Sequence, residues 1–174
     1  KGMTMTEENV TDDAAPAGTE SPQFALQRVY LKDLSFETPM GPEAFHRELK
    51  PQIAQELATK TNRLDETHFE VVITVTITVK DGNDTVYLIE VHQAGVFLVK
   101  GLDKSQMTHV INVLCPATLF PYAREVVDNI VIKGTFPALM LPPVNFEALF
   151  AQAVAEAKEK KEQEAESDKK DVTH

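Results

Sequence analysis

The sequence predicts an α+β domain, with a four-stranded antiparallel sheet and helices packed on one side of it. Three observations support this fold class. Residues 69–79 alternate between apolar and polar side chains, which is typical of a strand with one buried face. The polar turn that follows favours a hairpin. After residue 100 the apolar spacing becomes helical, so the strands come together in the chain and the helices follow, as in α+β domains.

The strands can be placed in order along the chain. Residues 24–38 are apolar and aromatic with rough alternation, and predict the first strand. After the strand at 69–79, the Asp-Gly-Asn-Asp turn at 81–84 leads into a return strand over 85–94. Gly95 predicts a bulge or tight turn before a short fourth strand over 96–100. This meander implies one covered sheet face.

Residues 41–62 give a weaker signal. Pro39, Pro42 and Pro51 break this stretch, so we expect an irregular connection there. A short helix is expected around residues 43–49.

Helices follow the strands. Asp103 can cap a short helix, with Gln106 in the capping-box position, and the Cys-Pro pair at 115–116 is expected to end it. A second helix is predicted over 119–133, with Gly134 at its C-terminal cap.

The last ordered part is an apolar loop followed by a helix. Residues 135–144 contain three prolines and many apolar side chains, and Asn145 is expected to cap a final helix with one apolar face. Glu and Lys continue at helical spacing towards the C-terminus, where we expect the helix to fray.

We expect three segments along the chain. Residues 1–22 are acidic and poor in large apolar side chains, which predicts disorder, and Lys1 and Gly2 resemble an expression scar before Met3. Residues 23–155 form the folded domain. Residues 156–174 form a charged tail, predicted to be frayed or disordered.

Composition excludes several classes of protein. The 174 residues include 17 Lys and Arg against 27 Asp and Glu, a net charge of -10, which argues against nucleic-acid binding. A single cysteine excludes an internal disulfide and a cysteine-rich metal site. With no apolar run long enough to span a bilayer and no export signal, we expect a cytoplasmic protein that does not insert into membranes.

The sequence shows no catalytic constellation. None of the five histidines has a zinc-ligand spacing, and there is no phosphate-binding glycine loop, so no metal, cofactor or enzyme activity is expected. His109 and Cys115 could be a base and a thiol, but a packed structural thiol is the favoured interpretation.

The alternation of side chains along the strands groups four residues, of which three are acidic. Leu88 and Glu90 point to the same side of the return strand, and Asp33 and Glu37 share a face of the first strand. If all four residues lie on the solvent-exposed face of the sheet, they form either an ordinary solvated surface or a docking surface for a basic partner.

The segment 135–150 is too apolar for a plain surface loop. It is either core or subunit interface, or part of a groove that accepts apolar segments of another chain.

Several long motifs resemble those of the bacterial protein-export chaperone family SecB. They are QRVYLKDLSFE from residue 27, EVHQAGVF from 90, CPATLFPYARE from 115, GTFPAL from 134 and PVNFEALF from 143. The resemblance covers about residues 23–150. The chain departs from the family pattern at Ala117, where the family usually has Asn, and at Leu49, where a Trp often occurs.

The resemblance implies an ATP-independent holdase. SecB-like chains form a homotetramer, a dimer of dimers, which binds unfolded preproteins and passes them to the SecA motor. The motor-docking residues would be Asp33, Glu37, Leu88 and Glu90. Their partner would be the basic, zinc-bearing tail of SecA, with the zinc belonging to that partner.

The resemblance also implies two further residue sets. Subunit association would involve Tyr87, Ile89, Val91 and Gln93. The client groove would use Phe45, Leu49, Phe136, Leu139, Leu141, Phe146 and Phe150. Three alternatives stay open: a SecB-like chaperone dedicated to a toxin-antitoxin pair, an enzyme using His92 and Glu90, and a purely structural oligomer.

Overall fold

The computed structural model describes residues 21–171, with side chains as far as residue 160. Its elements are β1 Gln23–Glu37, the 3-10 turn η1 Gly41–Phe45, β2 Gln52–Arg63, β3 His68–Asp81, β4 Asp84–Lys100, α1 Lys104–His109, the π-helical turn η2 Val110–Leu114, α2 Cys115–Lys133 and α3 Phe146–Asp171. Residues 1–20 and 172–174, where most of the expected terminal disorder falls, lie outside the described residues.

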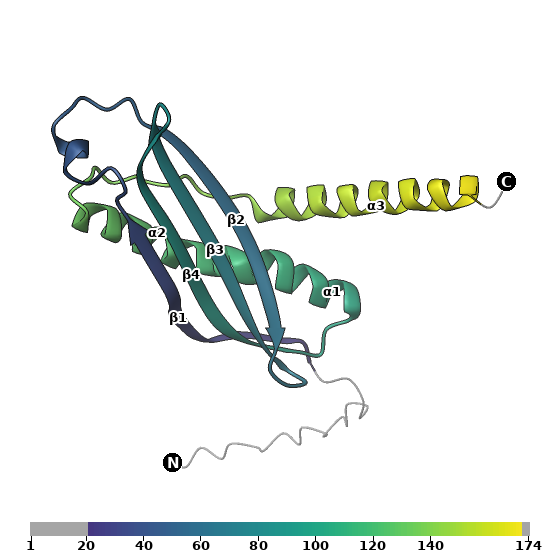
Figure 1. Cartoon of the computed structure of the whole chain (residues 1–174). Coiled ribbons are helices and arrows are strands. Elements are labelled where there is room, and N and C mark those ends of the chain that lie inside the picture. Colours follow the sequence, from purple (N-terminus) through teal and green to yellow (C-terminus); the bar gives the residue numbers. More distant parts are fainter. Residues whose placement is uncertain (1–20, 172–174) are drawn as a thin grey trace, which may run out of the picture.

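The four strands form one antiparallel sheet in the order β1-β4-β3-β2. α1 and α2 lie across one face of this sheet, called here the inner face, while α3 extends away from it (Figure 1). The predicted fold class is therefore confirmed. The order differs from a simple meander because β1 pairs with β4, the last strand, rather than with β2.

β2 is the element that the sequence prediction missed. Residues 52–63 form a regular strand paired with β3, so the expected irregular connection at 41–62 was wrong for its second half. β2 is an edge strand, and nearly all of its residues are exposed. A strand with no buried face has no reason to alternate in hydrophobicity, so its pattern carried no signal.

β4 runs without interruption through Gly95, so the predicted bulge or turn there was wrong. A Cβ atom at Gly95 would lie 2.7 Å from Cδ2 of Leu119 and 2.9 Å from Cε2 of Phe97. Glycine is needed because α2 packs closely against the strand at this point.

The helical region from Lys104 to Lys133 does not break at the Cys-Pro pair, contrary to expectation. The Asp103–Gln106 capping box is present at its start, as predicted. The π-helical turn η2 then leads directly into α2, and Pro116 sits in the first turn of α2. Proline lacks a backbone N–H, and the π-helical turn just before Pro116 already departs from the regular i→i−4 hydrogen-bond pattern.

α2 ends in a Schellman motif whose left-handed residue is not the glycine. Gly134 has φ −74°, whereas Thr135 has φ 63°. The Phe136 amide donates to the carbonyl of Val131 at 3.1 Å, which is the long hydrogen bond of this motif. Gly134 is required for another reason, since a Cβ there would lie 2.5 Å from Cζ of Phe36.

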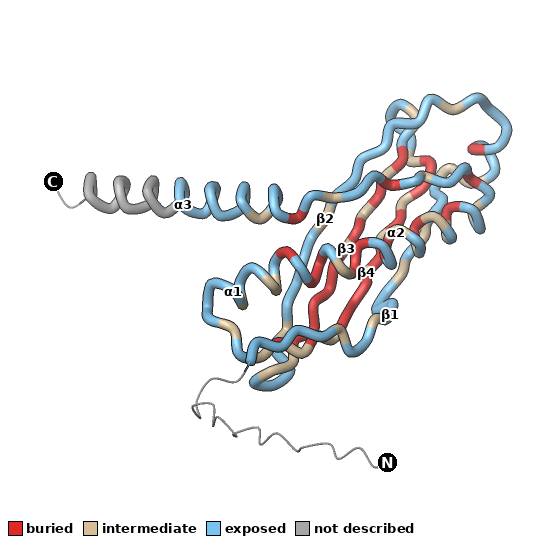
Figure 2. Tube along the Cα trace, turned by 180° about the vertical axis from the view of Figure 1, so that it is seen from behind, coloured by how far each residue is buried: buried red, intermediate tan, exposed pale blue. Residues whose placement is uncertain are grey.

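The core lies between α2 and the inner faces of β3 and β4 (Figure 2). Its fully buried members include Val71, Ile73, Val75, Ile77, Ile89, Val91 and Phe97 from the strands, and Leu119, Val127 and Val131 from α2. Each such side chain contributes roughly 1.5–3 kcal/mol on burial. The two central strands and one helix therefore form a rigid scaffold, and the irregular segments are attached to it.

The first turns of α3 anchor it to the domain. Asn145 Oδ1 accepts a hydrogen bond from the Ala148 amide at 3.0 Å, which confirms the predicted N-cap. Phe146 is buried against Phe120, with ring centroids 6.0 Å apart. Residues 151–160 are all exposed, and the predicted fraying of the tail stays a prediction.

Candidate functional site

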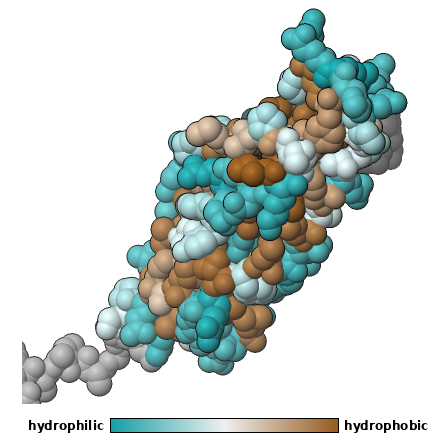
Figure 3. Space-filling view, turned by 90° about the vertical axis from the view of Figure 1, so that its left-hand side faces the viewer, coloured by the Kyte–Doolittle hydropathy of each residue, from teal (hydrophilic) through white to brown (hydrophobic). Residues whose placement is uncertain are grey.

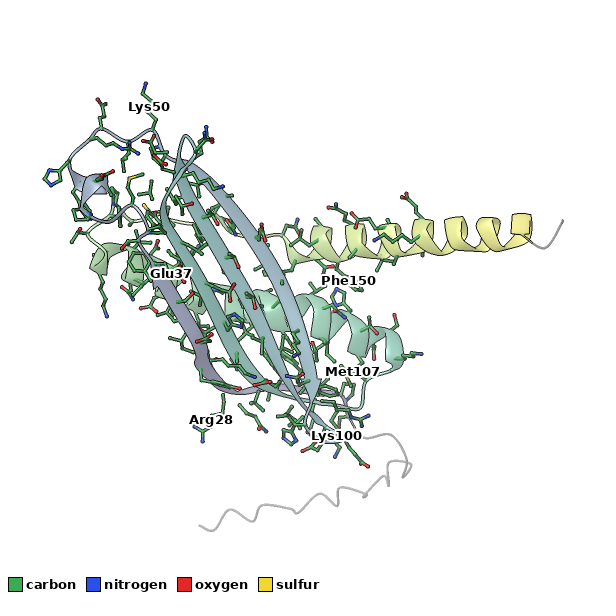
Figure 4. All side chains as sticks on the ribbon, viewed as in Figure 1. Arg28, Glu37, Lys50, Lys100, Met107 and Phe150 are labelled. Atoms are coloured by element: carbon green, nitrogen blue, oxygen red, sulfur yellow. The ribbon has the colours of Figure 1, made fainter. Side chains whose placement is uncertain are left out.

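The residues Asp33, Glu37, Leu88 and Glu90, called here the acidic surface, lie together on the outer face of the sheet. Glu37 is directly opposite Leu88, and Asp33 is opposite His92. Residues that face each other across an antiparallel pair share a sheet face, and Glu90 lies on that face between Leu88 and His92. Asp33 and Glu37 are exposed, and Figure 4 shows Glu37 at the end of β1 nearest η1.

The carboxylates of the acidic surface make few contacts within the chain. Glu90 Oε1 lies 2.8 Å from Nε2 of His92, whose side chain is 31% exposed. Asp33 Oδ1 accepts a hydrogen bond only from the neighbouring Leu34 amide among the bonds of the described residues, at 3.0 Å. These groups are thus available to a basic partner.

An apolar groove opens on the other side of the sheet, beside β2. It encloses about 340 Å³ between the segment after η1, the ends of β2, β3 and β4, and the segment after α2. Its lining consists of Leu49, Pro51, Ile53, Val79, Val86, Tyr87, Phe136, Pro137, Ala138 and Leu139. Apolar side chains also form patches among polar ones on the side face of the molecule seen in Figure 3. A hollow with this lining suits apolar side chains of another chain.

The structure brings only some of the predicted client-groove residues, called here the client set, to the apolar groove. Leu49, Phe136 and Leu139 line the apolar groove, and the Phe45 ring lies 5.2 Å from that of Phe136. Sequence reasoning missed Ile53, which is 55% exposed in the groove, because β2 itself was not recognised.

The other three members of the client set lie elsewhere. Leu141 is buried and borders a separate hollow of about 300 Å³. Phe146 packs on Phe120, and Phe150 points from α3 towards the α1–α2 helix, with its ring 6.4 Å from that of His109 (Figure 4).

Both irregular walls of the groove are held by carboxylates. On one side, Asp81 accepts a hydrogen bond from the Lys50 amide at 3.1 Å and pairs with Arg47 at 3.2 Å. On the other side, Asp128 accepts from the amide of Met140 at 3.1 Å. Met140 has φ 49°, a conformation that a side chain-bearing residue rarely adopts without such support.

Tyr87, Ile89, Val91 and Gln93 lie on the inner face, and each is at most 4% exposed. Gln93 Nε2 donates to the backbone carbonyl of Tyr30 at 2.8 Å. Burial raises the pKa of Tyr87 above its ordinary value. Within this chain the set belongs to the core rather than to a free surface.

Cys115 is fully buried, and this burial raises the pKa of its thiol to about 12. The described partner of His109 is another residue: its Nε2 lies 2.7 Å from Oε1 of Glu147. The packed-thiol interpretation is confirmed.

In the described part of the chain, no three His, Cys, Asp or Glu side chains are grouped to hold a metal. None of the described helices is long and apolar enough to cross a membrane.

Comparison with known proteins gives a consistent answer. A family model described as preprotein translocase subunit SecB matches residues 17–157. The protein-export protein SecB of Cellvibrio japonicus is 51% identical over 92% of this chain and 95% of its own length. That of Pseudomonas paraeruginosa is 54% identical over 85% of this chain and 90% of its own length.

A solved structure shares the fold at much lower identity. It is the SecB-like chaperone of Mycobacterium tuberculosis in complex with a peptide from an antitoxin, with a TM-score of 0.56 and 17% identity over 70% of this chain and 90% of that one. At this identity the likeness supports the fold alone. The family match and the high-identity relatives carry the assignment, and with it the expectation that the chain is not an enzyme. The chain belongs to the SecB family of protein-export chaperones.

Proposed function

We propose that this chaperone holds non-native preproteins at its apolar groove and delivers them to the SecA motor through its acidic surface. One observation carries the proposal: the two surfaces use opposite faces of the same sheet. Ile53, Val79 and Tyr87 of the groove belong to the inner face, while Leu88 and Glu90 belong to the outer face. Client and motor can therefore be bound at the same time.

Client selection rests on apolar chemistry. An unfolded preprotein exposes apolar segments that a folded protein buries, so a groove lined by Leu49, Phe136 and Leu139 favours the non-native state.

We place the chain in a homotetramer in the cytoplasm. Several grooves on one tetramer would bind one client with an avidity gain of about 10²–10⁴ over a single site, without ATP. Because Tyr87, Ile89, Val91 and Gln93 are buried in the subunit, their part in association would be indirect, through the packing of α2.

Motor recognition rests on charge. The exposed carboxylates of the acidic surface suit the basic, zinc-bearing tail of SecA, and the partly buried Leu88 offers an apolar contact among them. The net charge of -10 strengthens attraction to such a tail and keeps the apolar groove in solution.

The test compares two charge reversals on the outer face. Glu90→Lys should weaken SecA binding, while client binding and oligomeric state stay as in the wild type. Glu56→Lys is the matched control, because Glu56 is an exposed glutamate on the outer face of β2, outside the acidic surface. Wild-type affinity should fall with rising salt, as expected for exposed charges. Equal SecA affinity in the two variants would contradict the docking assignment.

A chaperone dedicated to a toxin-antitoxin pair remains the second candidate; the solved Mycobacterium tuberculosis structure that shares the fold is a SecB-like chaperone in complex with an antitoxin peptide. The high-identity relatives are protein-export proteins, which favours the export role. An antitoxin gene beside this one would support the alternative.

A further inference from the structure

Tyr87 carries the only polar side-chain group among the described residues that line the apolar groove. All the other lining residues are Leu, Ile, Val, Pro, Phe or Ala. Tyr87 lies opposite Val79 of β3, which lies opposite Ile53 of β2, so the three side chains form one row across the inner face. Tyr87 and Val79 are only 4% and 2% exposed, whereas Ile53 is 55% exposed. Tyr87 therefore belongs to the floor of the groove and Ile53 to its rim.

Two aromatic side chains hold the Tyr87 ring in place. Its centroid lies 4.6 Å from that of Phe136, in the segment after α2, and 6.0 Å from that of Phe36 on β1. A ring packed between two elements has little freedom left to lose when its hydroxyl binds a partner. Such a preorganised group can form a hydrogen bond with a ligand at a low entropic cost.

The Tyr87 hydroxyl makes no hydrogen bond to any described residue. No side-chain nitrogen or oxygen atom of the described residues is both fully buried and without a partner, so this hydroxyl keeps some accessible surface, and Tyr87 lines the groove. Burial raises the pKa of Tyr87, so the hydroxyl is protonated at neutral pH and can donate. Because a tyrosine hydroxyl in a buried residue usually has a partner, its lack of one within the chain points to a partner from outside.

The client that this groove is proposed to bind supplies a matching acceptor. An apolar segment has no polar side chains, so its hydrogen-bond acceptors are its backbone carbonyls. A carbonyl that enters the groove loses its water, and a buried carbonyl without a hydrogen bond is costly. The lining side chains offer it one donor, the hydroxyl of Tyr87. Backbone carbonyls occur in every client, so this contact does not depend on the client's sequence.

We propose that the Tyr87 hydroxyl donates a hydrogen bond to a backbone carbonyl of the client segment bound in the apolar groove. This inference rests on the proposed binding of non-native preproteins at that groove. It adds to the apolar contacts one polar contact that any unfolded chain can make.

The proposal predicts the opposite sign from apolar burial alone. Tyr87→Phe removes one oxygen atom and makes the lining wholly apolar, so hydrophobic contact alone would leave client affinity unchanged or raise it. The lost hydrogen bond would leave a client carbonyl buried without a partner, so client affinity should instead fall, by about fivefold or more. The free energy of unfolding should not fall, because the hydroxyl has no partner among the described residues.

The experiment titrates a fluorescent peptide, whose central segment has only apolar side chains, with the full-length chaperone. A second peptide carries esters in place of the central backbone amides, because an ester carbonyl is a weaker hydrogen-bond acceptor than an amide carbonyl. The wild type should bind the ester peptide more weakly than the amide peptide. This difference should shrink in Tyr87→Phe, as expected when the two changes remove the same interaction.

Tyr30→Phe is the matched control. It also removes a single hydroxyl, but the hydroxyl of Tyr30 donates to Glu70, and Tyr30 lies on the outer face opposite Ala94. Denaturant unfolding should show a loss of stability in Tyr30→Phe and none in Tyr87→Phe. Client affinity should fall in Tyr87→Phe alone, and native mass spectrometry should show the wild-type oligomeric state for both variants.

The outcomes separate this inference from the proposed function. If the wild type does not bind the amide peptide, the proposed function fails. If the wild type binds it and Tyr87→Phe binds it equally well or more tightly, the role of the hydroxyl is overturned. An affinity loss in Tyr87→Phe that comes with lower stability or an altered oligomeric state would also overturn it, and so would an equal affinity loss in Tyr30→Phe. An ester effect of the same size in the wild type and Tyr87→Phe would exclude the backbone carbonyl as the acceptor.

Discussion

The hydroxyl of Tyr30 on β1 donates a hydrogen bond to the carboxylate of Glu70 on β3, although β4 lies between the two strands. Ala94, the β4 residue opposite Tyr30 on the same face, is fully buried. The hydrogen bonds of Lys32, Tyr30 and Asn62 lower the pKa of Glu70 to about 2, and the bond to Glu70 raises the pKa of Tyr30 to about 12. The side chains of Tyr30, Lys32 and Asn62 are therefore held together by the ionised carboxylate of Glu70.

Glu70→Gln should destabilise the chain in a pH-dependent way. The folded pKa of about 2 lies below the ordinary value of 4.5, so ionised Glu70 stabilises the fold above pH 4.5 and loses this effect as pH falls towards 2. The contribution is of the order of 3 kcal/mol at neutral pH. Urea unfolding of wild type and variant at several pH values should show a difference that closes in acid. A difference that stays constant down to pH 2 would show that Glu70 acts through packing alone.

Thr135→Gly should stabilise the chain. Thr135 occupies the left-handed position of the Schellman motif, which costs an L-residue roughly 1–2 kcal/mol, and glycine recovers part of this after its own entropy cost. Denaturant unfolding should show a gain of up to about 1 kcal/mol. Gly134→Ala should have the opposite effect, because its Cβ would collide with Phe36. A loss of stability in Thr135→Gly would mean that its side chain makes an important contact.

The sequence predicted the parts of the fold whose side chains are buried on one side. Residues 69–79 alternate because β3 has one face under α2, and the Asp103 capping box is a local signal. β2 and the π-helical turn η2 could not be found in this way. β2 is an exposed edge strand, and the five residues of η2 include no glycine or proline that would indicate a change of helix type.

The candidate site was predictable to a similar extent. The alternation of side chains along a strand was enough to place Leu88 and Glu90 on one face of the sheet. Placing Asp33 on the same face depended on the register shift between Leu31 and Asp33, which no sequence pattern indicates. The groove needed Ile53, from a strand that was not recognised. Distances across the sheet, such as that from Lys32 to Glu70, depend on the strand order.

Cys115 should be unreactive in the native protein. The thiolate is the reactive form, and a rise in pKa from 9.0 to about 12 leaves about a thousandfold less of it at neutral pH. Ellman's reagent should therefore label the single thiol quickly in concentrated urea and very slowly without it. Equal rates in the two conditions would show that the helix around Cys115 opens readily.

Ile53→Glu should weaken client binding and leave SecA binding unchanged. Ile53 is 55% exposed in the apolar groove, so a glutamate there adds a charge to the surface that apolar client segments must cover, at little cost to folding. We expect client affinity to fall about fivefold or more, the effect of losing a contact worth about 1 kcal/mol.

The control is Ala54→Glu. Ala54 is the next residue of β2, is also exposed, and points to the outer face, so it adds the same charge to the same strand away from the groove. Fluorescence titration with a reduced, unfolded client would measure both variants. Equal loss in the two would mean that net charge governs client binding, and no loss in Ile53→Glu would place the client elsewhere than in this groove.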